Sequence, residues 1–246
     1  MTTDPWLQPP VAPGTTRLFC FPFAGGNGPA FKLWRSALAP DTEVWAVMLP
    51  ARGPRLADPP VTSMAELVSH LADAIAKLTD KPFAFFGHSL GSLVAFETTR
   101  ELRRRGLPLP QVLWASGAEG PRTREVKRHL HGLPHDEFIE ALRGYNGTPA
   151  ELLEHREIME LLYPALQADF GMAEQYEYRE EPPLALPIHA LYGHADPHVE
   201  YERVQGWAHE TTHRLSLHGF DGDHFFLFPH QEAITTLVAA ESWPSR

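Results

Sequence analysis

Short apolar runs alternate along the chain with longer segments whose apolar residues recur every three or four positions. Six runs have the length and composition of β-strands, and they are residues 17–23, 43–49, 83–86, 111–115, 188–192 and 214–217. Strands that alternate with helical segments are typical of βαβ units, which place their strands parallel in one sheet. The pattern therefore predicts an α/β fold with a mostly parallel central sheet flanked by helices.

The run at 83–86, Phe-Ala-Phe-Phe, has no polar face. A strand that is apolar on both sides fits the middle of a parallel sheet with helices on each face. Helical patterns precede and follow this run, at residues 63–78 and 90–105. Ser63 and Glu66 have the spacing of a capping box at the start of the first helix, and Gly106 is a suitable stop for the second.

The alternation stops between residues 119 and 181, where helical patterns occur without a convincing strand. We interpret this stretch as a helical lid insertion within a single domain that spans residues 1–246. A length of 246 residues suits one α/β domain with a sizeable core. The Pro-rich start, residues 1–16, is expected to form a loose arm.

The central strand leads directly into Gly87-His88-Ser89-Leu90-Gly91, which fits the pattern Gly-x-Ser-x-Gly. This motif forms a sharp strand-to-helix turn that exposes the serine, and its glycines leave room for the tight backbone. Ser89 is therefore the candidate nucleophile. Because a serine hydroxyl is a poor nucleophile at pH 7, it needs a histidine base that an acid orients.

An acid and a histidine follow the last two predicted strands in the order that such a site requires. Asp196 lies just after residues 188–192, and His224 lies in a Gly-containing turn after residues 214–217. The carboxyl ends of parallel strands meet at one edge of a sheet, which would bring both residues near Ser89. We therefore predict a catalytic triad of Ser89, Asp196 and His224.

Other residues near these positions could serve instead. Asp221 and Asp223 are rival acids, but both lie on the same loop as the histidine, and Asp196 is preferred. His194, Asp196 and His198 have a spacing that could suggest metal ligands. Pro197 and the lack of a further ligand cluster make a metal site the weaker interpretation, and no cofactor is expected.

Acyl transfer also needs two backbone donors for the oxyanion of its transition state. The N–H of Leu90 follows the nucleophile at the start of a helix and is the first candidate. The second should come from the loop after an early strand, where Ala24 precedes Gly25-Gly26. The N–H of Ala24 is our choice, although Gly25-Gly26 also fits an ordinary turn.

Composition narrows the classes of partner and location. The 31 acidic and 21 basic residues give a formal net charge of −10, which argues against nucleic acid as the main partner. No apolar run approaches the roughly 20 residues of a membrane span, and the start lacks the features of a secretion signal. Cys20 is the single cysteine, which agrees with a cytoplasmic location.

Six motifs in a fixed order carry a family resemblance: FPFAGG at 21–26, LPARG at 49–53, FGHSLG at 86–91, PALQAD at 164–169, YGHADP at 192–197 and GDHFF at 222–226. Together they cover almost the whole chain. The chain resembles the stand-alone, type II thioesterases of polyketide and nonribosomal peptide biosynthesis, which belong to the α/β-hydrolase superfamily. Singly, Gly-x-Ser-x-Gly is shared by many hydrolases and acyltransferases, whereas the ordered set is specific.

The resemblance implies a function, a partner and a set of roles. Ser89, Asp196 and His224 would be the triad, Ala24 and Leu90 the oxyanion donors, and residues 119–181 a lid over the acyl chamber. The enzyme would remove stalled or misprimed acyl groups from the phosphopantetheine arm of acyl or peptidyl carrier proteins, through an acyl-serine intermediate. The resemblance also suggests a monomer, and together with the composition we expect a cytoplasmic protein without a cofactor, metal, nucleic-acid or membrane partner.

Two positions depart from the family pattern. Ala51 stands where the family often has Gly, and Phe23 stands where it often has His or Tyr. Neither belongs to the triad, but Phe23 should lie beside the oxyanion loop and alter the fit of the substrate. Two basic patches could dock a carrier, although nearby acids favour ordinary charged helix faces; these patches are Arg100, Arg103, Arg104 and Arg105, and Arg122, Arg124, Lys127 and Arg128.

Three other functions remain as alternatives. A small-molecule carboxylesterase would use the same triad and differ only in its leaving group. An acyltransferase would have a different fold and usually a Glu where Ser92 stands. A catalytically dead hydrolase that serves as a binding module would not need an intact triad.

Overall fold

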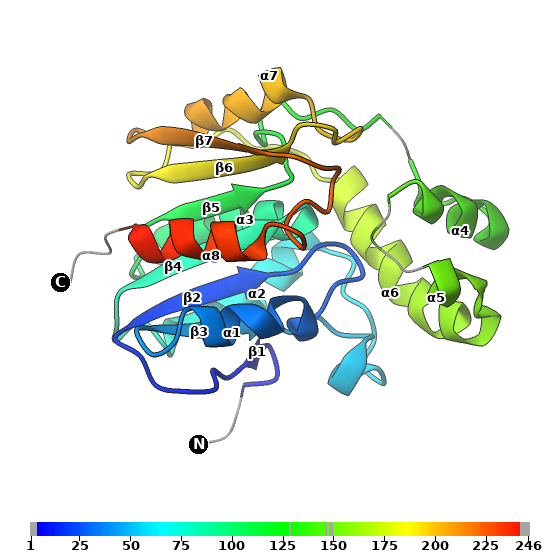
Figure 1. Ribbon diagram of the computed structural model, residues 1–246, viewed down its shortest axis with the longest axis horizontal. Helices are drawn as coiled ribbons and strands as arrows, with labels where there is room; N and C mark the ends of the chain where they lie inside the picture. The colour runs from blue at the N-terminus through cyan, green and yellow to red at the C-terminus, as the bar shows by residue number, and fades with distance from the viewer. Residues whose placement is uncertain (1–3, 128, 146, 148–149, 242–246) are drawn as a thin grey trace.

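The computed structural model describes residues 4–127, 129–145, 147 and 150–241, and its core is a seven-stranded sheet in the order β1-β3-β2-β4-β5-β6-β7 (Figure 1). Strands β2 to β7 pair in parallel, and β1 joins the edge strand β3 antiparallel. The strands are β1 (Leu7–Gln8), β2 (Thr16–Phe21), β3 (Thr42–Val47), β4 (Phe83–His88), β5 (Leu113–Ser116), β6 (Ile188–Gly193) and β7 (Leu215–Phe220). The six predicted strands are all present, which confirms the mostly parallel sheet.

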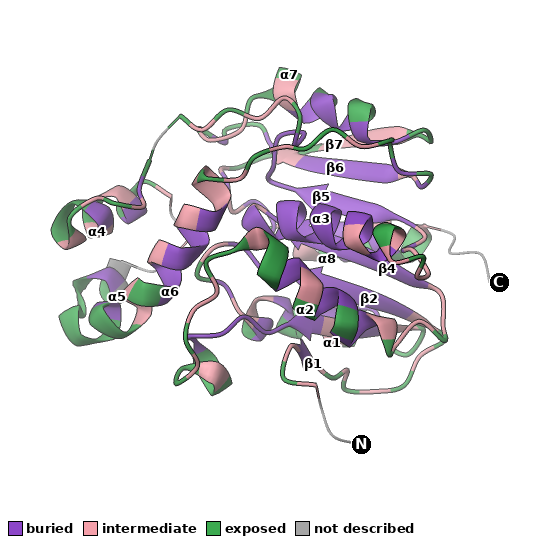
Figure 2. Ribbon diagram, turned by 180° about the vertical axis from the view of Figure 1, so that it is seen from behind, coloured by how far each residue is buried: buried purple, intermediate pink, exposed green. Residues whose placement is uncertain are grey.

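Helices cover both faces of this sheet. Helices α1 (Lys32–Ala37) and α8 (Gln231–Ala240) lie on one face, and α2 (Met64–Ala76) and α3 (Leu90–Arg104) lie on the other (Figures 1 and 2). The short elements between strands are η1 (Gly28–Phe31), η2 (Gly53–Arg55), α7 (Tyr201–Val204) and η3 (Gln205–Glu210). Ser63 caps α2 as predicted, since its side chain accepts a hydrogen bond from the N–H of Glu66 at 3.3 Å.

The apolar residues of β4 serve two separate cores. Phe83 and Phe85 pack with α2 and α3, whereas Ala84 and Phe86 pack with α1 and α8. Every residue of β4 is buried, as the purple ribbon in Figure 2 shows. A strand placed between two helical layers can be apolar at every position, which explains why this segment has no polar face.

The N-terminal segment does not form the loose arm that its prolines suggest. Residues 1–3 lie outside the described residues, but β1 begins only a few positions later and pairs with Ala46 and Val47 of β3. The side chain of Leu7 is only 3% exposed, and the indole of Trp6 stacks on His70 at 4.9 Å between ring centroids. The prediction was wrong because a two-residue strand has no periodic signal, and its pairing depends on an edge that forms elsewhere in the chain.

Among the described residues of 119–181, regular structure is helical and no strand occurs, as predicted. Helices α4 (His135–Arg143), α5 (Ala150–Glu154) and α6 (Arg156–Glu174) lie beyond the carboxyl ends of the strands (Figure 1). They share a small apolar core of Leu130, Phe138, Leu142, Leu153, Met159, Leu166 and Phe170. Within the described ranges, no helix has both the length and the apolar character needed to cross a membrane.

Candidate active site

Ser89 lies on a strained turn between β4 and α3. Its φ is 55°, a left-handed value that is uncommon for a residue with a side chain. The two motif glycines make this turn possible, because a Cβ on Gly87 would lie 2.2 Å from the carbonyl oxygen of Gly91. A Cβ on Gly91 would lie 2.1 Å from the carbonyl oxygen of Phe21. The backbone is therefore too close at both positions for any other residue.

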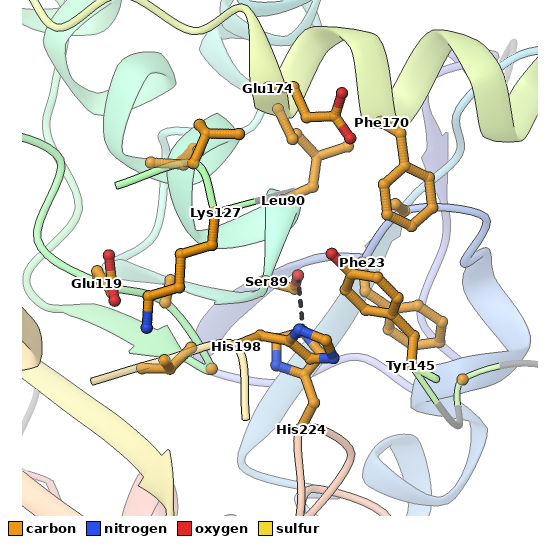
Figure 3. A pocket seen from close by; sticks show the side chains of 18 of the residues that line it. Phe23, Ser89, Leu90, Glu119, Lys127, Tyr145, Phe170, Glu174, His198 and His224 are labelled. Atoms are coloured by element: carbon orange, nitrogen blue, oxygen red, sulfur yellow. Dashed lines mark hydrogen bonds between the residues drawn. The ribbon is translucent and has the colours of Figure 1, made fainter. Parts of the chain in front are cut away.

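The structure brings the three predicted triad residues together in one hydrogen-bonded chain. The Nε2 atom of His224 lies 2.9 Å from the hydroxyl of Ser89, and the dashed line in Figure 3 marks this contact. The Nδ1 atom of His224 lies 2.7 Å from Oδ2 of Asp196. The three residues come from the ends of β4, β6 and β7, which is the order expected from the sequence.

Asp196 is held in place on its other side as well. Its Oδ1 atom accepts a hydrogen bond from the N–H of His198 at 2.8 Å, and its side chain is fully buried. Both carboxylate oxygens are thus occupied within the loop and the triad. The rival acid Asp223 instead accepts a hydrogen bond from the N–H of Phe225, and Asp221 contacts His230 through its main-chain carbonyl.

The two predicted oxyanion donors lie at the same cavity as the serine. Ala24 and Leu90 both line it together with Ser89. In the loop after β2, the N–H of Gly25 donates to Asp169 at 2.7 Å and the N–H of Gly26 donates to the carbonyl of Phe23 at 2.8 Å. Gly25 and Gly26 have therefore committed their donors to other groups.

A buried ion pair fixes this loop, and sequence reasoning did not identify it. Arg52 donates two hydrogen bonds to the carboxylate of Asp169, at 2.5 and 2.8 Å. The side chain of Arg52 is only 4% exposed and that of Asp169 only 2%. The same Oδ2 atom of Asp169 accepts the Gly25 N–H. The motifs LPARG and PALQAD contain these two residues, so the motifs were visible but their contact was not.

The cavity above Ser89 has a volume of about 470 Å³ and two kinds of wall. In the view of Figure 3, Phe23, Tyr145 and Phe170 lie on one side of Ser89, and Glu119 and Lys127 lie on the other. The apolar lining includes Phe23, Leu90, Leu93, Leu142, Leu166, Phe170 and Phe225, and the charged lining includes Glu119, Arg124, Glu125, Lys127 and Glu174. The cavity is therefore suited to a chain that is apolar along most of its length.

The imidazole of His88 is one of the aromatic rings that lie next to His224. The imidazole of His88 lies beneath it, at 5.3 Å between ring centroids, and its Nδ1 contacts the hydroxyl of Ser116 at 2.9 Å. Burial, together with the nearby His224, holds the pKa of His88 well below its usual value. His88 therefore stays neutral and adds no charge beside the base.

Tyr145 reaches this site from the helical segment between β5 and β6. Its ring stacks on His198 at 3.9 Å between centroids, and both rings present their faces or edges to His224, at 6.2 and 5.5 Å. Phe23 also lies where it was expected, beside Ala24, and its ring packs edge-on against Phe225 at 4.9 Å. The segment 119–181 thus contributes directly to the walls around the base.

The described residues place one group of side chains close enough to share a metal ion, and it is separate from the triad. This group is His129, His131 and Glu174. The carboxylate of Glu174 already accepts hydrogen bonds from the N–H groups of Leu130 and His131. These hydrogen bonds hold the loop at residues 130–131 against Glu174, and this role accounts for the position of the carboxylate.

Acids pair with the cations of the first basic patch and with two of the cations of the second. Arg103 and Arg104 pair with Glu181, and Arg105 pairs with Glu101 and Asp73. In the second patch, Lys127 pairs with Glu200 at 2.6 Å and Arg122 lies 3.5 Å from Glu180, while Arg128 lies outside the described residues. These contacts favour an ordinary charged helix face over a strongly basic docking surface for the first patch. The expectation of a helix face was wrong for the second patch, because residues 121–127 form a turn and irregular chain.

Comparison with known proteins agrees with this geometry. Residues 16–241 match the family model described as a thioesterase domain. The gramicidin S biosynthesis protein GrsT of Aneurinibacillus migulanus is 39% identical, over 86% of this chain and 83% of its own. The linear gramicidin dehydrogenase LgrE of Brevibacillus parabrevis is 37% identical, over 95% of this chain and 90% of its own.

A solved structure extends the likeness to the fold. The type II thioesterase BorB from the borrelidin biosynthetic cluster superposes with a TM-score of 0.89 at 33% identity, over 97% of this chain and 98% of its own. This match confirms the α/β-hydrolase fold. The chain therefore belongs to the thioesterase family, and within it to the type II thioesterases of the polyketide and nonribosomal peptide assembly lines.

Proposed function

We propose that this protein hydrolyses acyl thioesters on the phosphopantetheine arm of acyl or peptidyl carrier proteins and so clears stalled or misprimed groups. The observation that carries the proposal is the hydrogen-bonded chain from Ser89 through His224 to Asp196, which opens on a cavity of about 470 Å³. Type II thioesterases such as BorB share this fold across the whole chain. A thioester suits the site because its thiolate leaves easily, so the base has less protonation to perform than in amide hydrolysis.

The acylation step follows from the contacts of the triad. The Ser89 hydroxyl attacks the thioester carbonyl while Nε2 of His224, at 2.9 Å, takes its proton. Asp196 holds the ring through Nδ1 and stabilises the imidazolium that forms. Collapse of the tetrahedral intermediate breaks the C–S bond, and the imidazolium returns the proton to the departing sulfur. The acyl group then remains as an ester on Ser89.

Deacylation repeats the same chemistry with water. His224 takes a proton from a water molecule that attacks the ester carbonyl, and it later returns a proton to the Ser89 oxygen. The products are a free carboxylic acid and the regenerated enzyme. We assign stabilisation of both oxyanions to the N–H groups of Ala24 and Leu90, which lie at the cavity and at the N-terminus of α3.

We assign the role of lid to residues 119–181, within one domain that spans residues 1–246. The support for this role is the position of Tyr145 and Phe170, which line the cavity from that segment. Opening of the segment would admit the acyl group, and closure would cover the acyl chain inside the cavity while water still reaches the ester carbonyl. A monomeric state and a cytoplasmic location stay predictions from the sequence.

Hydrolysis of one short acyl group presented in three ways tests the function. The acyl group is presented as an oxygen ester, as a small thioester and on a phosphopantetheinylated carrier protein. A carrier thioester favoured about a hundredfold in kcat/KM, equivalent to about 2.7 kcal/mol of transition-state binding, supports the proposal. Equal cleavage of the oxygen ester without a gain from the carrier would instead indicate a carboxylesterase. The Ser89→Ala variant controls for hydrolysis that does not depend on the site.

A further inference from the structure

Arg124 differs from the other charged side chains that line the cavity. Glu125 pairs with Arg203, and Lys127 pairs with Glu200, so the charges of both are balanced outside the reacting centre. Each of these residues therefore already has a partner of opposite charge.

The two remaining acids of the cavity wall are held by backbone donors. Glu119 accepts hydrogen bonds from the N–H groups of Glu125 and Glu200, both at 3.0 Å. Glu174 accepts from the N–H groups of Leu130 and His131, at 2.7 and 3.1 Å. Backbone N–H groups that point at a carboxylate stabilise its charge, so neither acid needs the guanidinium as a partner.

Arg124 has a much less complete set of contacts. Its Nη1 donates one hydrogen bond to the carbonyl oxygen of Ala173 at 2.7 Å, and its guanidinium lies 5.9 Å from the ring of Tyr176. A guanidinium has five N–H donors, and within the described ranges no carboxylate lies at ion-pair distance from this one. Burial lowers the pKa of Arg124, and the nearby charges of Glu119, Tyr176 and Glu174 oppose this effect only in part. The side chain remains charged, so an additional anion would offset its desolvation.

Helix α6 connects this arginine to the oxyanion loop. Leu166, Phe170 and Ala173 are spaced four and three residues apart, which places them on one face of the helix, and all three line the cavity. Leu166 lies against Gly25, where an added Cβ would be 2.6 Å from its Cδ2 atom. Ala173 accepts the hydrogen bond from Arg124, seven residues or about 10 Å farther along the axis. An acyl chain bound to Ser89 can therefore follow this apolar face toward the guanidinium.

We propose that Arg124 binds an anionic oxygen group of the substrate, and that this group is a carboxylate at the far end of the acyl chain. Thioesters of dicarboxylic acids, with an apolar middle and a charged end, are then a preferred substrate class. The proposal rests on the proposed function. The phosphodiester of the phosphopantetheine arm has the same anionic chemistry and is the other possible source of the group.

The test compares matched thioesters that differ only at the far end of the acyl chain. Glutaryl, adipyl and pimeloyl groups are each paired with the chain in which an isopropyl group replaces the carboxylate: 5-methylhexanoyl, 6-methylheptanoyl and 7-methyloctanoyl. All six are attached to N-acetylcysteamine, a thiol without phosphate. The readout is the ratio of kcat/KM for the carboxylate to that for its isostere, because a general loss of activity or fold cancels in this ratio.

Three variants assign the preference to Arg124. In at least one pair, Arg124→Gln is expected to lower the ratio by about tenfold or more, and Arg124→Lys is expected to recover part of it. Arg122→Gln is the matched control, since Arg122 is exposed and pairs weakly with Glu180, and it should keep the parent ratio. Ratios that are the same in the parent and in Arg124→Gln for all three pairs would overturn the assignment to an acyl carboxylate.

The same variants distinguish the phosphate. The isopropyl-ended chains are presented on phosphopantetheine as well as on N-acetylcysteamine, and the two arms are compared. If Arg124→Gln removes a preference for the phosphorylated arm and leaves the acyl ratios unchanged, the anion is the phosphate and the proposed acyl class is wrong.

A binding measurement separates this inference from the proposed function. Calorimetry with the Ser89→Ala variant, with and without Arg124→Gln, records binding of adipyl-N-acetylcysteamine without turnover. Binding that weakens about tenfold on loss of Arg124 supports the inference even if the parent hydrolyses no thioester, a result that would refute only the function. Equal binding by the two variants would contradict the inference independently of activity.

Discussion

The guanidinium of Arg52 and the carboxylate of Asp169 form a two-point ion pair that also holds the loop beside the nucleophile. The atoms are 2.5 and 2.8 Å apart, and Oδ2 of Asp169 accepts the N–H of Gly25 as well. Gly25 follows Ala24, the proposed oxyanion donor, and Asp169 belongs to α6. One carboxylate thus connects the helical segment, the oxyanion loop and the turn after β3.

Replacement of Asp169 should lower kcat more than it changes KM. In Asp169→Leu, the Gly25 N–H loses its acceptor and the loop that carries Ala24 loses its anchor, so we expect kcat to fall by about tenfold or more. Asp169→Asn keeps an oxygen for Gly25 and should reduce kcat less. Steady-state kinetics on a thioester provide the measurement, and a change confined to KM would contradict the proposed role.

The same variants should unfold more easily. Removal of one partner leaves the Arg52 guanidinium buried and unpaired, which costs about 3 kcal/mol in the free energy of unfolding. Denaturant unfolding measures this cost. Restoration of stability in Arg52→Met/Asp169→Leu without restoration of kcat would separate the folding role of the pair from its role in the loop.

The strand-to-helix turn between β4 and α3 should not tolerate a methyl group at Gly91. Because that Cβ would lie 2.1 Å from the carbonyl oxygen of Phe21, Gly91→Ala must displace either α3 or the end of β2. We expect a loss of about 3 kcal/mol or more in stability, measured by denaturant unfolding. Gly106→Asn is the control, since no atom lies within 4 Å of its Cβ and Asn accepts a φ of 65°. Similar losses in both variants would refute the steric argument.

A partly buried histidine pair at β6 and β7 should make stability depend on pH. Nδ1 of His189 lies 3.0 Å from Nε2 of His218, and burial, followed by the charges of His218 and Arg214, lowers the pKa of His189 to about 4. Glu241 lies 3.5 Å from Nε2 but is one-third exposed, so it offsets burial only in part. Below pH 6.5 the unfolded chain takes up a proton that the folded chain refuses.

The free energy of unfolding should therefore decrease as the pH falls from about 6.5 to about 4. The lowered pKa of His189 corresponds to a loss of about 3 kcal/mol in the free energy of unfolding at pH 4, and this loss is absent above pH 7. His189→Phe preserves an aromatic ring against Trp114 but cannot be protonated, so its stability should vary less over this interval. Parallel pH profiles for the variant and the parent would argue against the assignment.

The acid of the triad can be identified by amide substitution. Asp196→Asn should lower kcat roughly 10⁴-fold, because an amide no longer stabilises the imidazolium or the correct tautomer of His224. Asp223→Asn keeps an oxygen for the N–H of Phe225 and should remain within about tenfold of the parent. Steady-state kinetics on one thioester compare the two variants. A larger loss of kcat in Asp223→Asn than in Asp196→Asn would show that the acid of the triad is Asp223.

Local sequence signals were sufficient for the sheet and for the order of the triad. The apolar run at 83–86 specifies a buried strand, and the motif from Gly87 to Gly91 specifies the strand-to-helix turn that follows it. Both signals lie within ten consecutive residues. Asp196 and His224 could be placed because the carboxyl ends of parallel strands converge. These predictions required only the order of the strands along the chain. They did not require knowing which side chains contact one another.

Contacts between distant segments were beyond such reasoning. Arg52 and Asp169 are 117 positions apart, and nothing in either local sequence names the other residue as a partner. Glu181 pairs with Arg103 and Arg104, which are 78 and 77 positions away along the chain, so this part of the first basic patch is neutralised only in the folded protein. Arg124 was considered as a surface cation, whereas the fold turns it toward the cavity.

The central claim is that the acyl group passes through an ester on Ser89, and rapid-quench mass spectrometry tests it most directly. The protein is mixed with an acyl-loaded carrier protein, and the reaction is quenched within one turnover. The protein is then digested, and the mass of the peptide that contains Ser89 is measured. We predict that this peptide gains the mass of the acyl group as the carrier loses it, and that Ser89→Ala shows neither the adduct nor more than about 10⁻⁴ of the turnover. Deacylation of the carrier at the parent rate by Ser89→Ala, or an acyl adduct on a different peptide, would contradict the account.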